Sequence, residues 1–150
     1  MAQTFSLQPL LELMQSRTDE ATRKLGQLLA AEQNQRSRLQ MLEQYREEYA
    51  QRMSEAVRNG LTPTALLNFQ SFIFRIDDAI AQQRVVVANS EKNTRQGQQQ
   101  WQEQNKQLKA IDTLSQRHDL RERYRENRSD QKLQDEFAAR RFRTEEDDGS

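Results

Sequence analysis

Apolar residues recur at alternating spacings of three and four along two long stretches of the chain, which is the pattern of a coiled-coil seam. The first seam runs from Leu7 to Ala56 and the second from Leu66 to Ile111. When the two are aligned in opposite directions, the residue numbers of facing positions always sum to 122, as in Ala56 with Leu66, Met53 with Phe69, Tyr49 with Ile73, Leu42 with Ile80, Ala21 with Trp101 and Leu11 with Ile111. One register therefore serves both stretches. It predicts an all-α fold, an antiparallel two-helix coiled-coil hairpin in which the second helix is longer than the first.

The residues between the two seams are typical of a turn. We expect a first helix over about residues 5–58, with Thr4 or Ser6 as its N-cap, because a hydroxyl there accepts from an orphan backbone N–H. Gly60 predicts a left-handed stop, and Thr62 with Pro63 reads as the N-cap and first residue of the next helix. The chain is thus expected to be a single hairpin, with a turn over 59–62, a second helix over about 63–141 and a disordered acidic tail over 142–150.

Composition narrows the class of protein. Only 34% of the 150 residues are hydrophobic and the mean hydropathy is −1.10, which suits long helices that bury one narrow stripe better than a compact globule. The 23 basic residues balance the 23 acidic ones, so no net field favours nucleic acid or a membrane surface. The sequence has no cysteine, no apolar run of the roughly 20 residues that a membrane helix needs, and no secretory signal at its start. We therefore expect a cytosolic protein with no nucleic-acid partner and no direct membrane insertion.

The sequence offers no constellation for catalysis. Its single histidine, His118, falls in the stretch expected to be unpaired and has no second ligand type at metal spacing, so a solvated side chain is the simpler interpretation. The glycines are scattered and form no phosphate loop. The carboxylates alternate with Arg and Lys, as on a solvated helix face. These patterns predict a non-enzymatic protein with no metal site and no cofactor.

Apolar residues near the turn exceed what a seam requires. Phe72, Ala79 and Val86 form a row that flanks the second seam, and the register places Tyr45 of the other arm beside Ala79. Either these side chains fold back over the seam, or they form an exposed patch that takes a partner. Leu67 and Phe74 point elsewhere and add to the apolar excess.

The second helix also outruns the first. Leu7 pairs near Ser115, so residues from Arg117 onward to about Arg141 are expected to form a single unpaired helix. Apolar residues recur there irregularly, at Leu120, Tyr124, Leu133, Phe137 and Phe142. A frayed solvated helix and a nucleic-acid-binding stripe are alternatives, but interspersed acids disfavour phosphate tracking. A socket in a protein partner suits the segment better.

Three stretches that include off-seam residues carry a family resemblance: Met41 to Tyr45 with Glu48 and Tyr49, Asn68 to Ile73 with Ala79 and Ile80, and Glu126 to Lys132 with Asp135 to Ala138. In these stretches, and in Trp101 and Gly60, the chain resembles the FliJ family of the bacterial flagellar type III export apparatus. The resemblance implies a hairpin similar to the central shaft of rotary ATPases. It also implies three partners, which are the hexameric export ATPase FliI, the export-gate protein FlhA and the export chaperones. A protein of this kind would be cytoplasmic and peripheral to the inner membrane at the flagellar base.

Two sets of site residues follow from the resemblance. The gate-binding surface would use Leu42, Tyr45, Tyr49, Phe72, Ile76, Ala79 and Gln83. This sequence departs from its relatives at Gln83, where they often carry histidine, and at Arg38. The ATPase-ring-binding set would be Arg123, Arg128, Gln131, Lys132, Asp135, Glu136, Phe137 and Arg140, carried over by segment likeness.

The predicted function is therefore a non-enzymatic coupling shaft and adaptor that promotes assembly of the ATPase ring and delivers chaperones and substrates. The alternative is a generic coiled-coil chaperone or scaffold that holds clients against the apolar patch. The hairpin has a rival too, a continuous two-chain coiled coil, which Gly60 and Pro63 oppose.

Overall fold

The computed structural model describes residues 4–148, and these form two helices, α1 (Gln8–Arg58) and α2 (Pro63–Asp148). The described residues contain no strand, and α2 is the longer helix, so the all-α prediction is confirmed. The chain divides into two units. One consists of residues 19–103, called the hairpin unit below, and the other combines residues 1–18 with 104–150, called the terminal unit.

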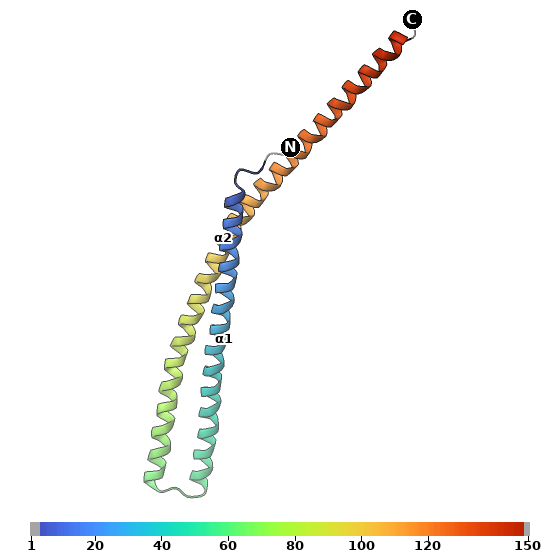
Figure 1. The fold of residues 1–150 in the computed structure, drawn as a ribbon. Helices are drawn as coiled ribbons and strands as arrows, with labels where there is room; N and C mark the ends of the chain where they lie inside the picture. Colours follow the sequence, from blue (N-terminus) through green and yellow to red (C-terminus); the bar gives the residue numbers. More distant parts are fainter. Residues whose placement is uncertain (1–3, 149–150) are drawn as a thin grey trace. The chain divides into compact units, whose positions relative to one another are not determined.

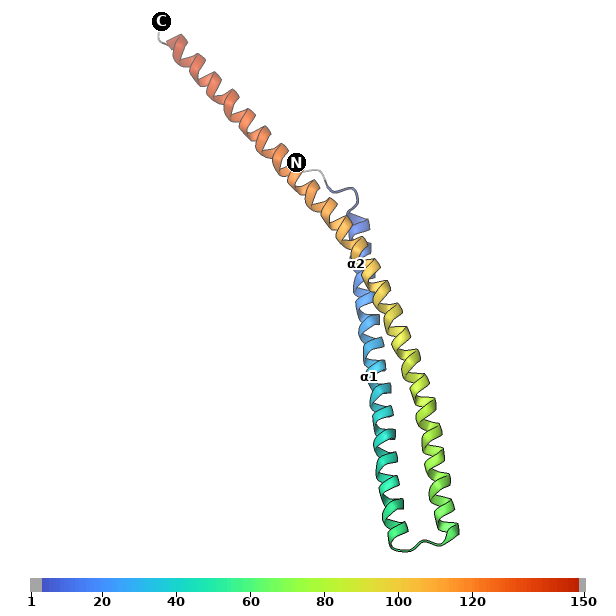
Figure 2. The same ribbon diagram turned by 180° about the vertical axis from the view of Figure 1, so that it is seen from behind.

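In the hairpin unit, α1 and α2 run antiparallel and side by side, and both views show the short loop that joins them (Figures 1 and 2). Gly60 ends α1 with a φ of 93°, the left-handed conformation predicted for it. The Thr62 hydroxyl oxygen accepts from the Ala65 backbone N–H at 3.2 Å, which is the N-cap bond expected at the start of α2. The turn is therefore built as the sequence predicts.

The seam follows the predicted register. All predicted seam positions from Leu11 to Ala56 and from Leu66 to Ile111 are buried or half-buried. The Thr94 hydroxyl donates to the Leu28 carbonyl, and in the terminal unit the Thr18 hydroxyl donates to the Gln104 carbonyl, both at 3.4 Å. Both pairs have residue numbers that sum to 122. The register deduced from the alternating spacings is therefore confirmed.

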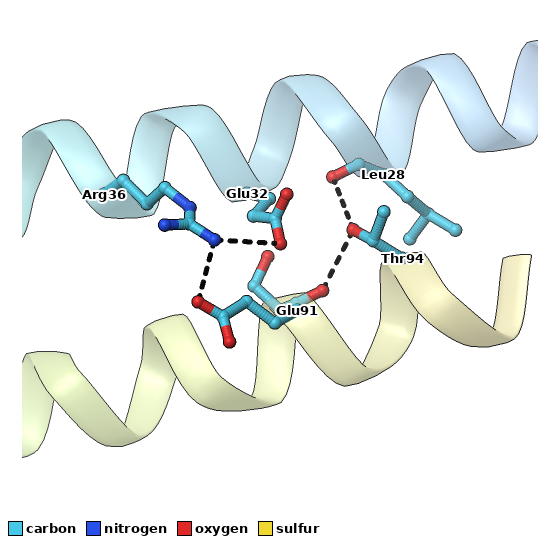
Figure 3. A network of polar contacts seen from close by, with 6 residues as sticks. Leu28, Glu32, Arg36, Glu91 and Thr94 are labelled. Atoms are coloured by element: carbon cyan, nitrogen blue, oxygen red, sulfur yellow. Dashed lines mark hydrogen bonds and ion pairs between the residues drawn. The ribbon is translucent and has the colours of Figure 1, made fainter. Parts of the chain in front are cut away.

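Polar residues interrupt the apolar seam midway along the hairpin unit. Figure 3 shows Arg36 between two carboxylates, 3.6 Å from Glu32 on its own helix and 2.8 Å from Glu91 on α2. Towards the turn, the Gln83 amide donates to the carbonyl of Gln35 at 2.9 Å. Polar layers of this kind lose stability relative to an apolar layer but specify one alignment of the two helices.

Gly97 lies in the same part of the seam. A leucine side chain of α1 occupies the space that a Cβ atom at this position would fill. A Cβ atom at this position would lie 2.5 Å from Cδ1 of Leu28 and 3.8 Å from Cδ1 of Leu25. The glycine therefore lets α1 pack a leucine directly against the backbone of α2. Nearby, the Trp101 indole N–H donates to the Thr22 hydroxyl oxygen at 2.8 Å and ties the two helices together.

The start of α1 differs from the prediction. The helix begins at Gln8 rather than near residue 5, and the Leu7 carbonyl accepts the first α-helical bond, from Leu11 N–H at 2.9 Å. Leu7, and not Thr4 or Ser6, is therefore the residue whose carbonyl opens the helix. The preceding residues form a turn in which Gln8 N–H donates to the Phe5 carbonyl at 3.1 Å.

That turn also changes where pairing ends on α2. The Phe5 ring packs against the His118 ring with centroids 5.5 Å apart, and Ser115, His118 and Glu122 are half-buried. The expectation that His118 is a solvated residue on an unpaired helix is therefore wrong. The reason is that Phe5, which lies outside the heptad pattern, packs on the His118 ring.

Beyond Glu122, every residue of α2 from 123 to 147 is exposed. The helix continues to Asp148, past the predicted end near residue 141, because no glycine or proline interrupts it before Gly149. Residues 142–148 are thus helical in the structure, where a disordered acidic tail was expected. Gly149 and Ser150 lie outside the described residues.

Candidate partner-binding surfaces

Four aromatic rings meet across the two helices near the turn. The Tyr49 ring lies 4.6 Å from Phe72 and 5.3 Å from Phe69, and the Tyr45 ring lies 6.3 Å from both Tyr49 and Phe72. The spacing i, i+4 on α1 and i, i+3 on α2 places each pair on one helix face, and the antiparallel register brings the two faces together. Tyr45 meets Phe72 edge to face, which is a favoured arrangement of aromatic rings.

An open groove of about 540 Å³, here the turn-proximal groove, lies beside this aromatic cluster. It is lined by Arg38, Met41, Leu42, Gln44, Tyr45, Glu48 and Gln83. Tyr45 is 43% exposed and Met41 is 69% exposed, so both present apolar surface to a partner. The groove therefore presents two apolar side chains side by side. One is Tyr45, which packs against the rings of Tyr49 and Phe72, and the other is the flexible Met41.

The structure places the predicted gate-binding residues at three depths. Leu42, Tyr45 and Gln83 line the groove, while Tyr49 and Phe72 are half-buried in the aromatic cluster that supports Tyr45. Ala79 is half-buried, and Ile76 is only 5% exposed because it packs in the seam. The set therefore occupies one region, but Ile76 supports this surface from within.

Met41 is a lining residue that sequence reasoning left out. It precedes the seam residue Leu42 and lies four positions before Tyr45, so it shares the face of Tyr45 on α1. That i, i+4 relation to an off-seam aromatic residue is the signal that could have revealed it. Gln44 and Glu48 complete the α1 side of the groove and were also outside the predicted set.

The opposite flank of the hairpin unit is charged and closed by ion pairs. The Arg46 guanidinium bonds both carboxylate oxygens of Asp77, and Arg84 lies 3.5 Å from Glu43. The hydrogen bond from Arg46 lowers the pKa of Asp77 below its ordinary value, an effect that desolvation opposes and the charge of Arg46 reinforces. The same pairing raises the pKa of Arg46. The two flanks thus differ in chemistry, since one is occupied by ion pairs and the other carries an open apolar groove.

The second surface is the exposed end of α2, residues 123–147. All members of the predicted ring-binding set are exposed here, and Phe137 is 69% exposed. Phe137 also lines a groove of about 380 Å³ with Leu133, Gln134, Ala138 and Arg141. The helix does not gather the set on one face, because Phe137 lies about 180° around the axis from Arg128 at about 100° per residue. The residues therefore surround the helix.

Metal-ion clusters and membrane-spanning helices are two further features to consider in residues 4–148. That part of the chain contains no group of three or more His, Cys, Asp or Glu residues arranged to hold a metal ion. None of its helices combines the length and the apolar character needed to cross a bilayer.

Comparison with known proteins identifies the family. The model of the family described as Flagellar FliJ protein matches residues 3–147. This chain belongs to the FliJ family. A Flagellar FliJ protein of Salmonella typhi is 33% identical over 140 residues, which cover 93% of this chain and 95% of the relative. A Flagellar FliJ protein of Escherichia coli strain K12 is 31% identical over the same length and the same shares.

Membership of the FliJ family confirms the resemblance inferred from the three motif stretches. The match includes the aromatic cluster, the turn-proximal groove and the exposed end of α2. The chain is therefore a flagellar protein whose family supports a place in the flagellar export apparatus.

Proposed function

We propose that this chain is a non-enzymatic coupling shaft and adaptor of the bacterial flagellar type III protein export apparatus. Its terminal unit binds the hexameric export ATPase FliI and promotes assembly of the ATPase ring. Its turn-proximal groove binds the export gate FlhA and assists delivery of chaperones and substrates. The protein works in the cytoplasm, peripheral to the inner membrane at the flagellar base. Membership of the FliJ family supports this assignment.

The turn-proximal groove is the observation that carries the proposal. Tyr45 is fixed in place by Tyr49 and Phe72, so its exposed ring loses little conformational freedom when a partner covers it. Ordered tyrosines of this kind are frequent hot spots of protein interfaces. Met41 beside it adapts to the shape of the partner because its side chain is flexible. The ion pairs on the opposite flank leave this side of the hairpin unit as the apolar one.

The exposed end of α2 supports an enclosing partner. Side chains that surround a single helix on all sides match a socket or ring better than a flat surface, which would reach only one face. Leu133 and Phe137 offer apolar anchors on one side, and Arg128 and Lys132 offer cations on the other. A ring of subunits would contact both sides together.

The test of the groove uses the double variant Tyr45→Ala with Phe72→Ala. Removing a supported hot-spot ring typically costs about 2 kcal/mol or more of binding free energy, so the affinity for purified cytoplasmic FlhA should fall at least about 30-fold. Val57→Ala, an exposed apolar residue of α1 outside the groove, is the matched control and should bind normally. Circular dichroism should show that both proteins keep their helices. Unchanged affinity in the double variant would contradict the assignment of this groove to the gate.

A generic coiled-coil chaperone or scaffold is the second candidate, because the same apolar groove suits an unfolded client. Such a protein would bind a reduced, unfolded model protein through Tyr45 and Phe72 and would show no saturable binding to FlhA. Measuring both ligands with the same pair of variants separates the two functions.

A further inference from the structure

Charged residues of opposite sign face each other along the ion-paired flank of the hairpin unit. On this flank each helix offers one position per heptad, which is the residue that follows every second seam position. Arg36 and Glu43 occupy it on α1, and they pair across the seam with Glu91 at 2.8 Å and Arg84 at 3.5 Å. Both pairs have residue numbers that sum to 127, so the two pairs share one register.

The sign of the charge alternates from heptad to heptad on both helices. On α2 the position is occupied by Asp77, Arg84 and Glu91, seven residues apart. By the register, Asp77 faces the uncharged Ala50, and the Arg46 guanidinium of the seam bonds both carboxylate oxygens of Asp77 instead. Each of these charges is therefore paired with the other helix. We call this set the charge column, namely Arg36, Glu43, Asp77, Arg84 and Glu91.

A slip of one heptad between the helices would bring like charges together in either direction. In one direction, Arg36 would face Arg84 and Glu43 would face Asp77. In the other direction, Glu43 would face Glu91 and Arg36 would lose its partner. Like charges directly opposite each other disfavour a pairing. The charge column therefore opposes both one-heptad slips and favours only the observed alignment.

The apolar seam does not exclude such a slip, because its pattern repeats every heptad. The register sets Leu42 against Ile80, and after a slip Leu42 would meet Ile73 or Val87, which are also branched aliphatic residues. The turn opposes a slip only locally, since the connection at Gly60 would lengthen by the seven residues of one heptad. Discrimination between heptad registers must therefore come from positions that do not repeat.

A match of side-chain size supports the same alignment. Leu28 fits against Gly97, where its Cδ1 lies 2.5 Å from the place that a Cβ atom would take. After a one-heptad slip, Leu28 would meet Val87 or Trp101 and would find no such space. Size at Gly97 and charge along the column are independent properties, and both favour the observed register.

We propose that the charge column selects the register of the hairpin and thereby positions the turn-proximal groove. A one-heptad slip moves one helix about 10 Å past the other, which would separate Tyr45 from Phe72. None of the charge column lines the groove, so its members act on the groove only through the alignment of the helices. The inference concerns this alignment and does not rest on the proposed function.

Engineered disulfides report the register, because the chain has no cysteine of its own. A cysteine at Gln35 is combined with one at Val87, which faces it in the observed register, or with one at Ile80 or Thr94, which would face it after a slip. The three α2 positions are matched, since they are 7%, 6% and 7% exposed. In the otherwise unsubstituted chain, we expect rapid oxidation only for the pair at 35 and 87.

Reversing the charges of α1 tests the column. Arg36→Glu with Glu43→Arg keeps the net charge but sets like charges opposite each other in the observed register. In the slip that joins 35 to 80, the same change creates two opposite pairs. The rate of oxidation of the 35–80 pair relative to the 35–87 pair should therefore rise at least about tenfold. An unchanged ratio overturns the proposal.

Reversing α2 as well is the rescue experiment. Adding Arg84→Glu and Glu91→Arg restores both opposite pairs, so the ratio of the two disulfides should return close to its original value. This step also separates the column from the contact of Arg36 with Glu32, which lie 3.6 Å apart on one helix and which both reversed proteins lose. Should the α1 variant lose helical structure, recovery of circular dichroism on adding the α2 changes supports the proposal. Failure to recover overturns it.

Glu20→Arg with Arg23→Glu is the matched control. Both residues are exposed, lie on α1 and are outside the seam and the charge column, and the exchange keeps the net charge. It should leave the ratio of the disulfides unchanged. An increase as large as that of Arg36→Glu with Glu43→Arg would show that the effect is not specific to the column and would overturn the assignment.

Discussion

At the scale of single residues, Gly26 and Gly97 differ in what surrounds them, although both are helical glycines of the hairpin unit. Nothing lies within 4 Å of the space that a Cβ atom would occupy at Gly26. At Gly97 that space holds the end of the Leu28 side chain. The register places Gly97 in the seam and Gly26 outside it, and the structure adds that the space at Gly97 is filled by Leu28 of the other helix.

The two alanine variants should therefore differ. Gly26→Ala should stabilise the protein by about 1 kcal/mol, because alanine is the better helix former and fills open space. Gly97→Ala gains the same helical preference but forces Leu28 out of its rotamer, at a cost of about 0.5–1.5 kcal/mol. We expect its net effect to be near zero or slightly destabilising in chemical unfolding. A larger gain at Gly97 than at Gly26 would contradict the packing described here.

At the scale of elements, the paired parts of both helices could be predicted, and their ends could not. Many seam positions on both arms support one register, so a single misassigned residue does not change the predicted pairing. The helix ends depend on single local events instead. Phe5 packs on His118 from outside the heptad pattern, and α2 continues to Asp148 because nothing stops it earlier. Neither event has a periodic signal.

The ion pair between α1 and α2 predicts a pH dependence. Because Arg46 lowers the pKa of Asp77 in the folded state, the pair contributes stability above the unfolded pKa of about 3.9, and that contribution is lost as the pH falls through the lower folded value. Asp77→Asn should therefore reduce the free energy of unfolding at pH 6 and have little effect at pH 2. Urea unfolding at both pH values measures this.

Arg46→Gln serves as the complementary variant for that experiment. It removes the hydrogen-bond donor and should show the same change with pH as Asp77→Asn. A constant difference from the unsubstituted protein at both pH values would mean that the pair does not shift the titration of Asp77.

At the scale of the whole molecule, the two proposed binding surfaces belong to different units of the chain. The groove is part of the hairpin unit, whereas residues 123–147 belong to the terminal unit. The sequence predicted the centre of the first surface, because Tyr45 and Phe72 are off-seam aromatics in one register. It missed Met41, whose position next to a seam residue resembles ordinary heptad filling. For the second surface it predicted an unpaired helix, but no pattern there selects one face.

The two functions should be separable by substitution. Leu133→Ser with Phe137→Ser should abolish stimulation of the FliI ATPase rate and leave FlhA affinity unchanged, whereas Tyr45→Ala with Phe72→Ala should do the reverse. Because Leu133 and Phe137 are exposed, the thermal unfolding of the first variant should match that of the unsubstituted protein within about 0.5 kcal/mol. A variant that loses both activities would show that the surfaces do not act independently.

None of the side chains in the described part of the chain is less than 2% exposed. Many layers of the seam therefore each contribute a small part of the folding free energy, as in repeat proteins, and no single layer dominates it. This has an evolutionary consequence. A chain of this kind tolerates gradual replacement of most residues provided that each change keeps its place in the heptad, which accords with relatives only 31–33% identical along 95% of their length. Insertions are constrained more severely, because one extra residue in either arm displaces every later pair. Lineages of such proteins should therefore differ far more in residue identity than in the matched lengths of their two arms.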